Sequence, residues 1–229
     1  MKFSYIDQGA EKAMVILPGW GFDAAVFPLG RFPCNIIVPD SPLTGHVDDS
    51  LFQFLQHCGC GPVDVLGWSL GSICAARFAS SHPELVGNLV LVSARSHYPE
   101  QELSGMMTAI MEDRTKALGR FYVMAFHGQK EDYRNFRKEH MERLSGAWDT
   151  KNLIKGLNFL TQQPINTSYF NNINDINISF IHGRHDIIAP IECMPVPGHL
   201  SSARVHILED AGHVPFLKQE FHEIISNLS

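Results

Sequence analysis

Long apolar stretches are missing from this 229-residue chain. A helix that crosses a bilayer needs about 20 predominantly apolar residues in a row, and no segment comes near that length. The first residues, Met1 to Asp7, make too short and too polar a stretch for a secretory signal peptide. Internal repeats and low-complexity tracts are also missing. We therefore expect a cytoplasmic, monomeric protein with one globular core and no membrane association.

Cysteines are few, and their spacing is irregular. Their number is odd, which does not suggest a set of disulfides: Cys34, Cys58, Cys60, Cys74 and Cys193. The single C-x-C pair has no second pair to complete a zinc site. We therefore expect free thiols, no metal and no organic cofactor. A net charge of −6 also argues against general nucleic-acid binding.

What the chain does have is a regular alternation of apolar runs and amphipathic stretches, which is typical of an α/β fold with a mostly parallel sheet. Strands are predicted at 3–6, 13–17, 35–38, 63–66, 88–92, 178–182 and 205–208, and a closing amphipathic helix at 214–228. Between Val92 and Ile178 the strand rhythm stops, and the composition becomes helical.

A serine between two glycines follows one of the predicted strands. The segment Gly67-Trp68-Ser69-Leu70-Gly71 lies between the apolar run 62–66 and a helical stretch of small residues. This context of strand, sharp turn and helix indicates a nucleophile elbow, in which the serine hydroxyl is lifted clear of the sheet. The backbone there is strained, and side chains in place of the two glycines would collide with the turn or its neighbours.

A serine hydroxyl needs a base and an orienting acid to become a nucleophile. Loops after the last two predicted strands supply both, with Asp186 after the strand at 178–182 and His213 after the strand at 205–208. This order of serine, acid and histidine is the one expected with an elbow. We predict Ser69 as nucleophile, His213 as general base and acid, and Asp186 as the group that fixes the imidazole tautomer. His185 is the rival base, and Asp210 is a weaker rival acid.

The alkoxide that forms during ester cleavage needs two backbone N–H donors. One is expected from Leu70, the residue after the nucleophile. The other is expected from Trp20, which stands between two glycines directly after the buried strand at 13–17. The alternative for this second segment is a tight loop without a catalytic role.

Four segments together resemble the α/β-hydrolase superfamily: Gly19-Trp20-Gly21, 67–71, Gly183-Arg184-His185-Asp186 and 212–216. The Trp before the serine, with Gly-Trp-Gly upstream, is most similar to the pimeloyl-[acyl-carrier protein] methyl ester esterases of biotin synthesis. The resemblance implies a mostly parallel sheet of six to eight strands flanked by helices, with a helical lid inserted after the sixth strand. It also implies the same triad and oxyanion donors, and an acyl pocket walled by Trp20 and Trp68.

The expected division is a core of residues 1–96 and 166–229 and a helical lid of residues 97–165, because ligands bind at the carboxyl ends of strands in open α/β sheets. The alternative is extra helical packing without a lid function. Apolar side chains from the lid are expected to line the acyl pocket, although such a stripe also suits a plain core. The candidates are Phe121, Phe126, Tyr122, Met106, Met107, Met111 and Met124.

Charge is unevenly distributed between these two parts. Residues 97–165 hold ten basic and nine acidic residues, a net charge of +1, whereas the rest of the chain has a net charge of −7. Arg134, Arg137 and Lys138 share one face of a predicted helix. This face is a candidate docking site for a small acidic acyl carrier protein. The alternative is a solvated face paired with Glu139 and Glu142.

These features together predict a serine carboxylesterase that hydrolyses an acyl methyl ester through an acyl-enzyme. The resemblance makes pimeloyl-[acyl-carrier protein] methyl ester the expected substrate. Three alternatives remain open. They are a general short-chain carboxylesterase, a triad-dependent C–C hydrolase or lyase as in menaquinone synthesis, and a non-catalytic ligand-binding homologue.

Overall fold

A computed structural model describes residues 1–173, 175–195 and 203–228 of the chain. In this part, seven strands form one sheet in the order β1-β3-β2-β4-β5-β6-β7. All neighbouring strands are parallel except β1 and β3, which are antiparallel. The strands are β1 (Phe3–Ile6), β2 (Ala13–Leu17), β3 (Asn35–Pro39), β4 (Val63–Trp68), β5 (Val86–Val92), β6 (Asn177–Gly183) and β7 (Arg204–Leu208). The predicted strands are therefore confirmed to within two residues at each end.

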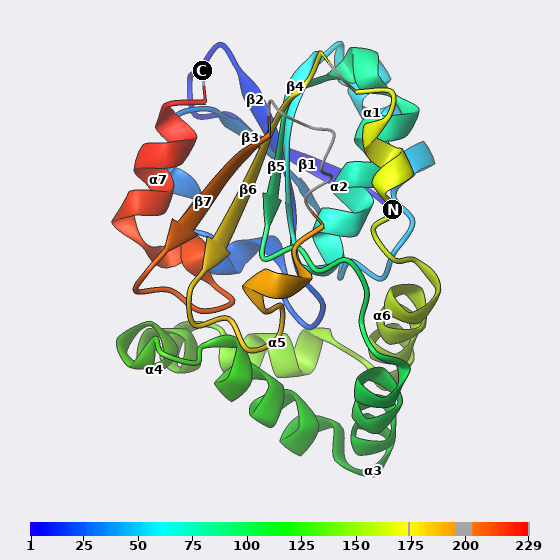
Figure 1. Ribbon diagram of the computed structural model, residues 1–229, viewed down its shortest axis with the longest axis vertical. Coiled ribbons are helices and arrows are strands. Elements are labelled where there is room, and N and C mark those ends of the chain that lie inside the picture. Colours follow the sequence, from blue (N-terminus) through cyan, green and yellow to red (C-terminus); the bar gives the residue numbers. More distant parts are fainter. Residues whose placement is uncertain (174, 196–202, 229) are drawn as a thin grey trace.

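Helices cover both faces of the sheet. Figure 1 shows α7 (Gln219–Ser226) on one side, and α1 (Asp48–Cys58) and α2 (Leu70–Ser81) on the other. Because both faces are covered, the inner strands are almost continuously apolar, as in the fully buried β2 run Met14 to Leu17. Phe27 stacks on Phe216, and Phe32 packs edge-on against Phe221 of α7.

The registers of the inner strands align their carboxyl ends. Trp68 pairs with Val92, Val92 pairs with Ile181, and Gly183 pairs with Leu208. The loops that follow β4, β5, β6 and β7 therefore leave the sheet at one edge, although they lie far apart in the sequence.

Between β5 and β6 the chain forms four helices, here called the helical insertion: α3 (Glu100–Ala125), α4 (Lys130–Glu139), α5 (Met141–Ala147) and α6 (Thr150–Gln162). Figure 1 shows them gathered beyond the carboxyl ends of the strands. The insertion follows β5, the fifth strand in the chain, and not a sixth strand as expected, because only β1 to β4 come before β5.

Helix α3 is broken in its middle. Asp113 has φ −153° and ψ 93°, and its carboxylate accepts a hydrogen bond from the Lys116 N–H at 3.0 Å. Asp113 therefore ends one helical half and caps the next. The chain changes direction at this break, and both halves contribute side chains to one cavity.

The expectation of five free thiols is wrong. Cys58 and Cys60 form a disulfide, whereas Cys34, Cys74 and Cys193 are free. Gly59 lies between the paired cysteines in the left-handed conformation, with φ 63°. This turn brings the two Cα atoms to 5.3 Å, a separation that a disulfide can span. Within the described residues, we find no helix that combines the length and the apolar character of a membrane span.

Candidate active site

Ser69 lies on a strained turn between β4 and α2. Its backbone has φ 55° and ψ −113°, a conformation that residues with a side chain rarely adopt. A Cβ atom at Gly67 would overlap the carbonyl oxygen of Gly71, and one at Gly71 would overlap that of Leu17. The prediction that neither glycine has room for a side chain is confirmed.

Asp186 and His213 meet at the sheet edge. His213 Nδ1 lies 2.8 Å from Asp186 Oδ2, and both side chains are buried. The other carboxylate oxygen, Oδ1, accepts the N–H groups of Ile188 and Ala189 at 2.9 and 2.8 Å. Burial works to raise the pKa of Asp186, but the charge of His213 and these hydrogen bonds outweigh it and hold the pKa below its usual range. The group facing the imidazole is therefore an ionised acceptor.

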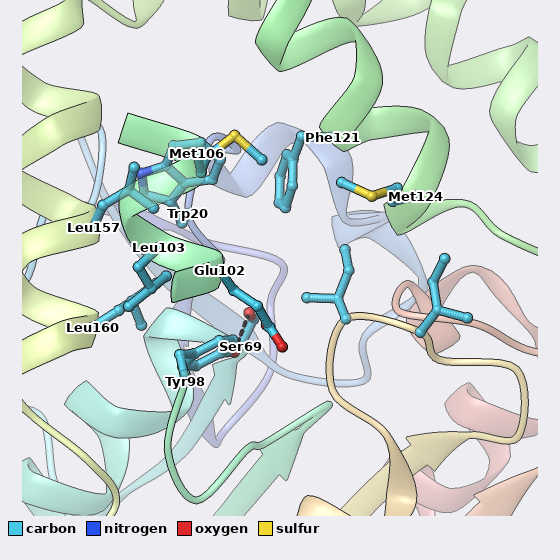
Figure 2. A pocket seen from close by; sticks show the side chains of 12 residues that line it. Trp20, Ser69, Tyr98, Glu102, Leu103, Met106, Phe121, Met124, Leu157 and Leu160 are labelled. Carbon is cyan, nitrogen blue, oxygen red and sulfur yellow. Dashed lines mark hydrogen bonds between the residues drawn. The ribbon is translucent and has the colours of Figure 1, made fainter. Parts of the chain in front are cut away.

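The Ser69 hydroxyl is bonded to a residue that the sequence did not single out. Its Oγ lies 3.2 Å from the hydroxyl of Tyr98, as Figure 2 shows. Among the hydrogen bonds of the described residues, none joins Ser69 to His213. Burial raises the pKa of Tyr98 to about 12, so the phenol is protonated at neutral pH.

The backbone of His213 is held against the elbow. Trp68 Nε1 donates to the His213 carbonyl at 2.7 Å, and the Ser93 hydroxyl donates to the same oxygen at 3.2 Å. The Trp68 and His213 rings lie with their centroids 5.6 Å apart. Because Trp68 directly precedes Ser69, these contacts tie the His213 loop to the strand that ends at the serine turn. Trp68 is fully buried and does not line the cavity at Ser69, which differs from its expected place in the acyl pocket.

The two expected oxyanion donors, Leu70 and Trp20, belong to two segments that adjoin Ser69. Leu70 is the first residue of α2, so its N–H has no acceptor within the helix. The loop that carries Trp20 passes directly beside Ser69, since a Cβ at Gly19 would lie 3.3 Å from Ser69 Cβ. Trp20 itself is fixed by a hydrogen bond from its Nε1 to the Leu153 carbonyl of α6 at 2.9 Å.

A cavity of about 340 Å³ opens above Ser69. Figure 2 shows side chains from α3 and α6 facing Trp20 and Ser69 across it. Most of its walls are apolar: Trp20, Leu103, Met106, Phe121, Met124, Leu157, Leu160, Ile187 and Ile188. Phe121, Met106 and Met124 thus lie where the sequence suggested.

Other expected lining residues lie elsewhere. Phe126 is buried against Tyr133 and Phe136 and does not reach the cavity at Ser69. Tyr122 is buried and donates its hydroxyl to the Gly21 carbonyl. Met111 is 75% exposed. A helix pattern gives the apolar positions but not which of them meets a cavity.

The polar wall of the cavity was not predicted. It consists of Tyr98 and Glu102, with the guanidinium of Arg95 behind them. Arg95 donates to both Glu102 oxygens, at 2.8 and 3.2 Å, and lies 5.0 Å from the centre of the Tyr98 ring. The sequence feature that could have identified these residues is their position just after β5, at the same sheet edge as the elbow.

The rival residues do not form the same arrangement. Asp210 is exposed, and His185 packs its ring against Gly128. A further histidine, His182, lies 3.7 Å from Asp186 Oδ2 and bonds to the Ala189 carbonyl at 2.6 Å. Burial lowers the pKa of His182, so it is neutral beside the carboxylate. Among the described residues, no group of three or more histidine, cysteine or acidic side chains is arranged to hold a metal ion.

The three basic residues lie together on α4. Arg134, Arg137 and Lys138 are all exposed. In the part of the chain that the structure describes, none of them forms an ion pair, so pairing with Glu139 or Glu142 is not observed. The turn before α4 packs on His185, two residues before the cavity wall residue Ile187.

Comparison with known proteins identifies the family of this chain. A family model described as the alpha/beta hydrolase fold matches residues 39–220, and the chain belongs to this family. It is 28% identical to a pimeloyl-[acyl-carrier protein] methyl ester esterase of Aeromonas hydrophila, over 93% of this chain and 94% of that protein. A protein of the same name from Nitrosomonas europaea is 30% identical, over 69% and 66% of the two chains. These relatives support an esterase of the α/β-hydrolase type.

Solved structures share the fold at low identity. The alpha/beta hydrolase MGS-M2 from a Medee basin deep-sea metagenome library superposes with a TM-score of 0.81 at 15% identity, over 99% of this chain and 93% of that one. The esterase EaEST from Exiguobacterium antarcticum superposes with a TM-score of 0.80 at 19% identity, over 99% and 95%.

Proposed function

We propose that this protein is a serine carboxylesterase that works through an acyl-enzyme. The observation that carries the proposal is the 2.8 Å pairing of Asp186 with His213 beside a strained serine elbow. In this assignment Ser69 attacks the ester carbonyl, and Nε2 of His213 accepts the proton of the serine hydroxyl. Asp186 holds the imidazole proton on Nδ1, so that Nε2 is unprotonated and free to act as the base.

The first step requires a rotation of the Ser69 side chain. Its hydroxyl leaves Tyr98 and turns toward His213, a change between staggered side-chain positions. The backbone N–H groups of Leu70 and Trp20 receive the negative charge on the carbonyl oxygen. His213 then protonates the leaving alcohol and activates water, which releases the acid and restores Ser69.

The cavity supports an acyl chain as the substrate. Its volume of about 340 Å³ lies in the range of small-molecule pockets. Its apolar walls favour a chain of methylene groups, since each buried one contributes about 0.8 kcal/mol. We propose that the helical insertion acts as a lid over this chain, and that 97–165 is its extent in the sequence.

The named relatives point to a methyl ester carried on acyl carrier protein, in biotin synthesis. Arg134, Arg137 and Lys138 are exposed and form no ion pair with any described residue, which supports a docking surface for such an acidic partner. Their helix begins at the turn that packs on His185, close to the cavity wall at Ile187. A carrier on this surface would lie near the entrance of the cavity.

Labelling with a fluorophosphonate and turnover of short p-nitrophenyl esters test the reaction. We expect rapid labelling and turnover by the natural sequence and loss of both in Ser69→Ala. A lyase would turn over such esters poorly, and a binding protein would keep its biological activity in Ser69→Ala. Rescue of a biotin auxotroph lacking the esterase, by the natural sequence only, would support the specific substrate. Failure to rescue despite good ester turnover would leave a general carboxylesterase.

Charge reversal tests the carrier surface. Arg134→Glu with Arg137→Glu is expected to raise KM for the carrier-linked ester about tenfold at low salt, and less at high salt. The KM for the free methyl ester should not change. Lys12→Glu with Arg204→Glu is the control with the same change in charge, because both residues are exposed and stand at the amino-terminal ends of β2 and β7. Equal effects on both substrates would exclude this surface as the docking site.

A further inference from the structure

One side chain of the helical insertion bonds to both neighbours of His213. Gln129 lies in the turn between α3 and α4 and is 2% exposed. Its Oε1 accepts the N–H of Gly212 at 2.7 Å, and its Nε2 donates to the carbonyl of Val214 at 3.2 Å. A single amide group therefore holds the backbone on either side of the histidine.

The backbone of this turn also rests directly on the histidine loop. A Cβ atom at Gly212 would overlap the His127 carbonyl oxygen and lie 3.3 Å from Gln129 Oε1. One at Gly128, where φ is +78°, would lie 3.3 Å from His185 Cβ. The same turn thus packs on the loop of His213 and on the residue next to Asp186.

The orientation of the Gln129 amide is fixed by a third contact. Nε2 also donates to Asp132 Oδ2 at 2.9 Å, and that carboxylate binds Lys218 Nζ at 2.8 Å. A flipped amide would set its oxygen against the Asp132 carboxylate and the Val214 carbonyl, which offer no proton. The His213 carbonyl is held from elsewhere, by Trp68 and Ser93. The peptide groups around the base are therefore bonded to β4, to the end of β5 and to the insertion.

We propose that Gln129 is a positioning residue for His213, and that the turn 127–129 of the insertion is part of the support of the catalytic base. The inference rests on the proposed role of His213. Small displacements of a catalytic group are costly, since a shift of about 1 Å can reduce the rate about 100-fold. On this reading the turn stays fixed on the histidine loop when the rest of the insertion admits substrate.

The test compares Gln129→Met with Leu144→Ala. Methionine keeps the approximate length but removes both hydrogen bonds to the histidine loop, and kcat for a short p-nitrophenyl ester should fall about 30- to 100-fold with KM within about twofold. Leu144 is fully buried in α5 of the same insertion and does not line the cavity. Its truncation lowers stability without touching the histidine loop, so kcat of the folded fraction should stay within about twofold.

Gln129→Glu adds a readout that a packing role would not move. A protonated carboxyl accepts from Gly212 and has one proton to donate to Val214 or Asp132, where the amide has two, whereas a carboxylate has none and faces Asp132. The ratio of kcat in Gln129→Glu to kcat in the natural sequence should rise about tenfold as pH falls from about 8 to about 5. Because kcat of both proteins depends in the same way on the protonation of the catalytic groups, this shared pH dependence cancels in the ratio.

Two results would overturn the inference. One is Gln129→Met with kcat within threefold of the natural sequence while Ser69→Ala and His213→Ala are inactive. The other is a Gln129→Glu ratio that does not change with pH. If Ser69→Ala or His213→Ala kept full turnover, the proposed function itself would fail, whatever Gln129 does.

Discussion

Replacing Asp186 by asparagine tests the geometry of the site most directly. The oxygen Oδ1 accepts two backbone N–H groups, from Ile188 and Ala189. An asparagine must leave its carbonyl oxygen there, because its NH2 group cannot accept them. The NH2 group then points at His213 Nδ1, in place of the oxygen that lies at 2.8 Å.

This fixed orientation determines the size of the effect. An NH2 group and an Nδ1–H are both donors, so His213 must move its proton to Nε2. Nε2 then cannot accept the proton of Ser69. The corresponding change in a serine protease lowers kcat about 10⁴-fold, which is about 5.5 kcal/mol of transition-state stabilisation. We expect a similar loss here at neutral pH.

The assay is kcat/KM for a short p-nitrophenyl ester, with urea unfolding to confirm that the variant is folded. Asp210→Asn is the matched control, since Asp210 is exposed and precedes His213 by three residues. Its activity should stay within about twofold, as is usual for exposed positions. An Asp186→Asn protein that is folded and within tenfold of the natural activity would refute the assignment.

Three further changes have defined outcomes. Tyr98→Phe removes a hydrogen bond of about 1 kcal/mol that holds the Ser69 hydroxyl away from His213, so the rate of fluorophosphonate labelling should rise about fivefold. A tenfold fall in this rate would mean that the phenol takes part in the reaction. Gly71→Ala should lower the free energy of unfolding, measured in urea, by about 3 kcal/mol or more, because the new Cβ would overlap the backbone of Leu17. Its control is Gly105→Ala on α3, where a Cβ would meet open space and should raise the free energy of unfolding by up to about 1 kcal/mol. Equal effects of the two substitutions would contradict the packing argument. The pKa of Asp186 is below its ordinary value of 3.8 in the folded protein, so its ionised form contributes stability that is fully present above about pH 4 and is lost as pH falls toward the folded pKa. The stability gap to Asp186→Asn should therefore be constant above about pH 5 and shrink below about pH 4, and a gap that stays constant below about pH 4 would count against the charge pairing.

Most features that the sequence predicted have a local cause, and the pairing of the acid with the histidine follows from a general rule of sheet topology. Buried parallel strands are short apolar runs, so the boundaries of β2 and β4 follow from composition. The elbow glycines are equally local, because the turn itself excludes a side chain at Gly67 and Gly71. The pairing of Asp186 with His213 followed from the rule that parallel strands end at one edge.

The lining of the cavity depends on tertiary packing and was predicted only in part. The residues of α3 divide between cavity, core and solvent according to where the helix breaks, and Asp113 is one of several polar residues in that stretch. An aspartate caps a helix only where the chain turns, and packing decides that. For this reason Phe121 lines the cavity while Phe126 lies in a separate aromatic cluster.

The role of Trp68 shows how the two kinds of information combine. Its position before the nucleophile suggested a wall of the acyl pocket, yet its ring packs beneath the elbow against Phe22 and Phe216. From there Nε1 reaches the His213 carbonyl, 145 residues further along the chain. A phenylalanine would fill much of the same space but would leave that carbonyl with the longer bond from Ser93. The residue type at this position therefore follows from a backbone group of the histidine loop, which no local pattern around Ser69 contains.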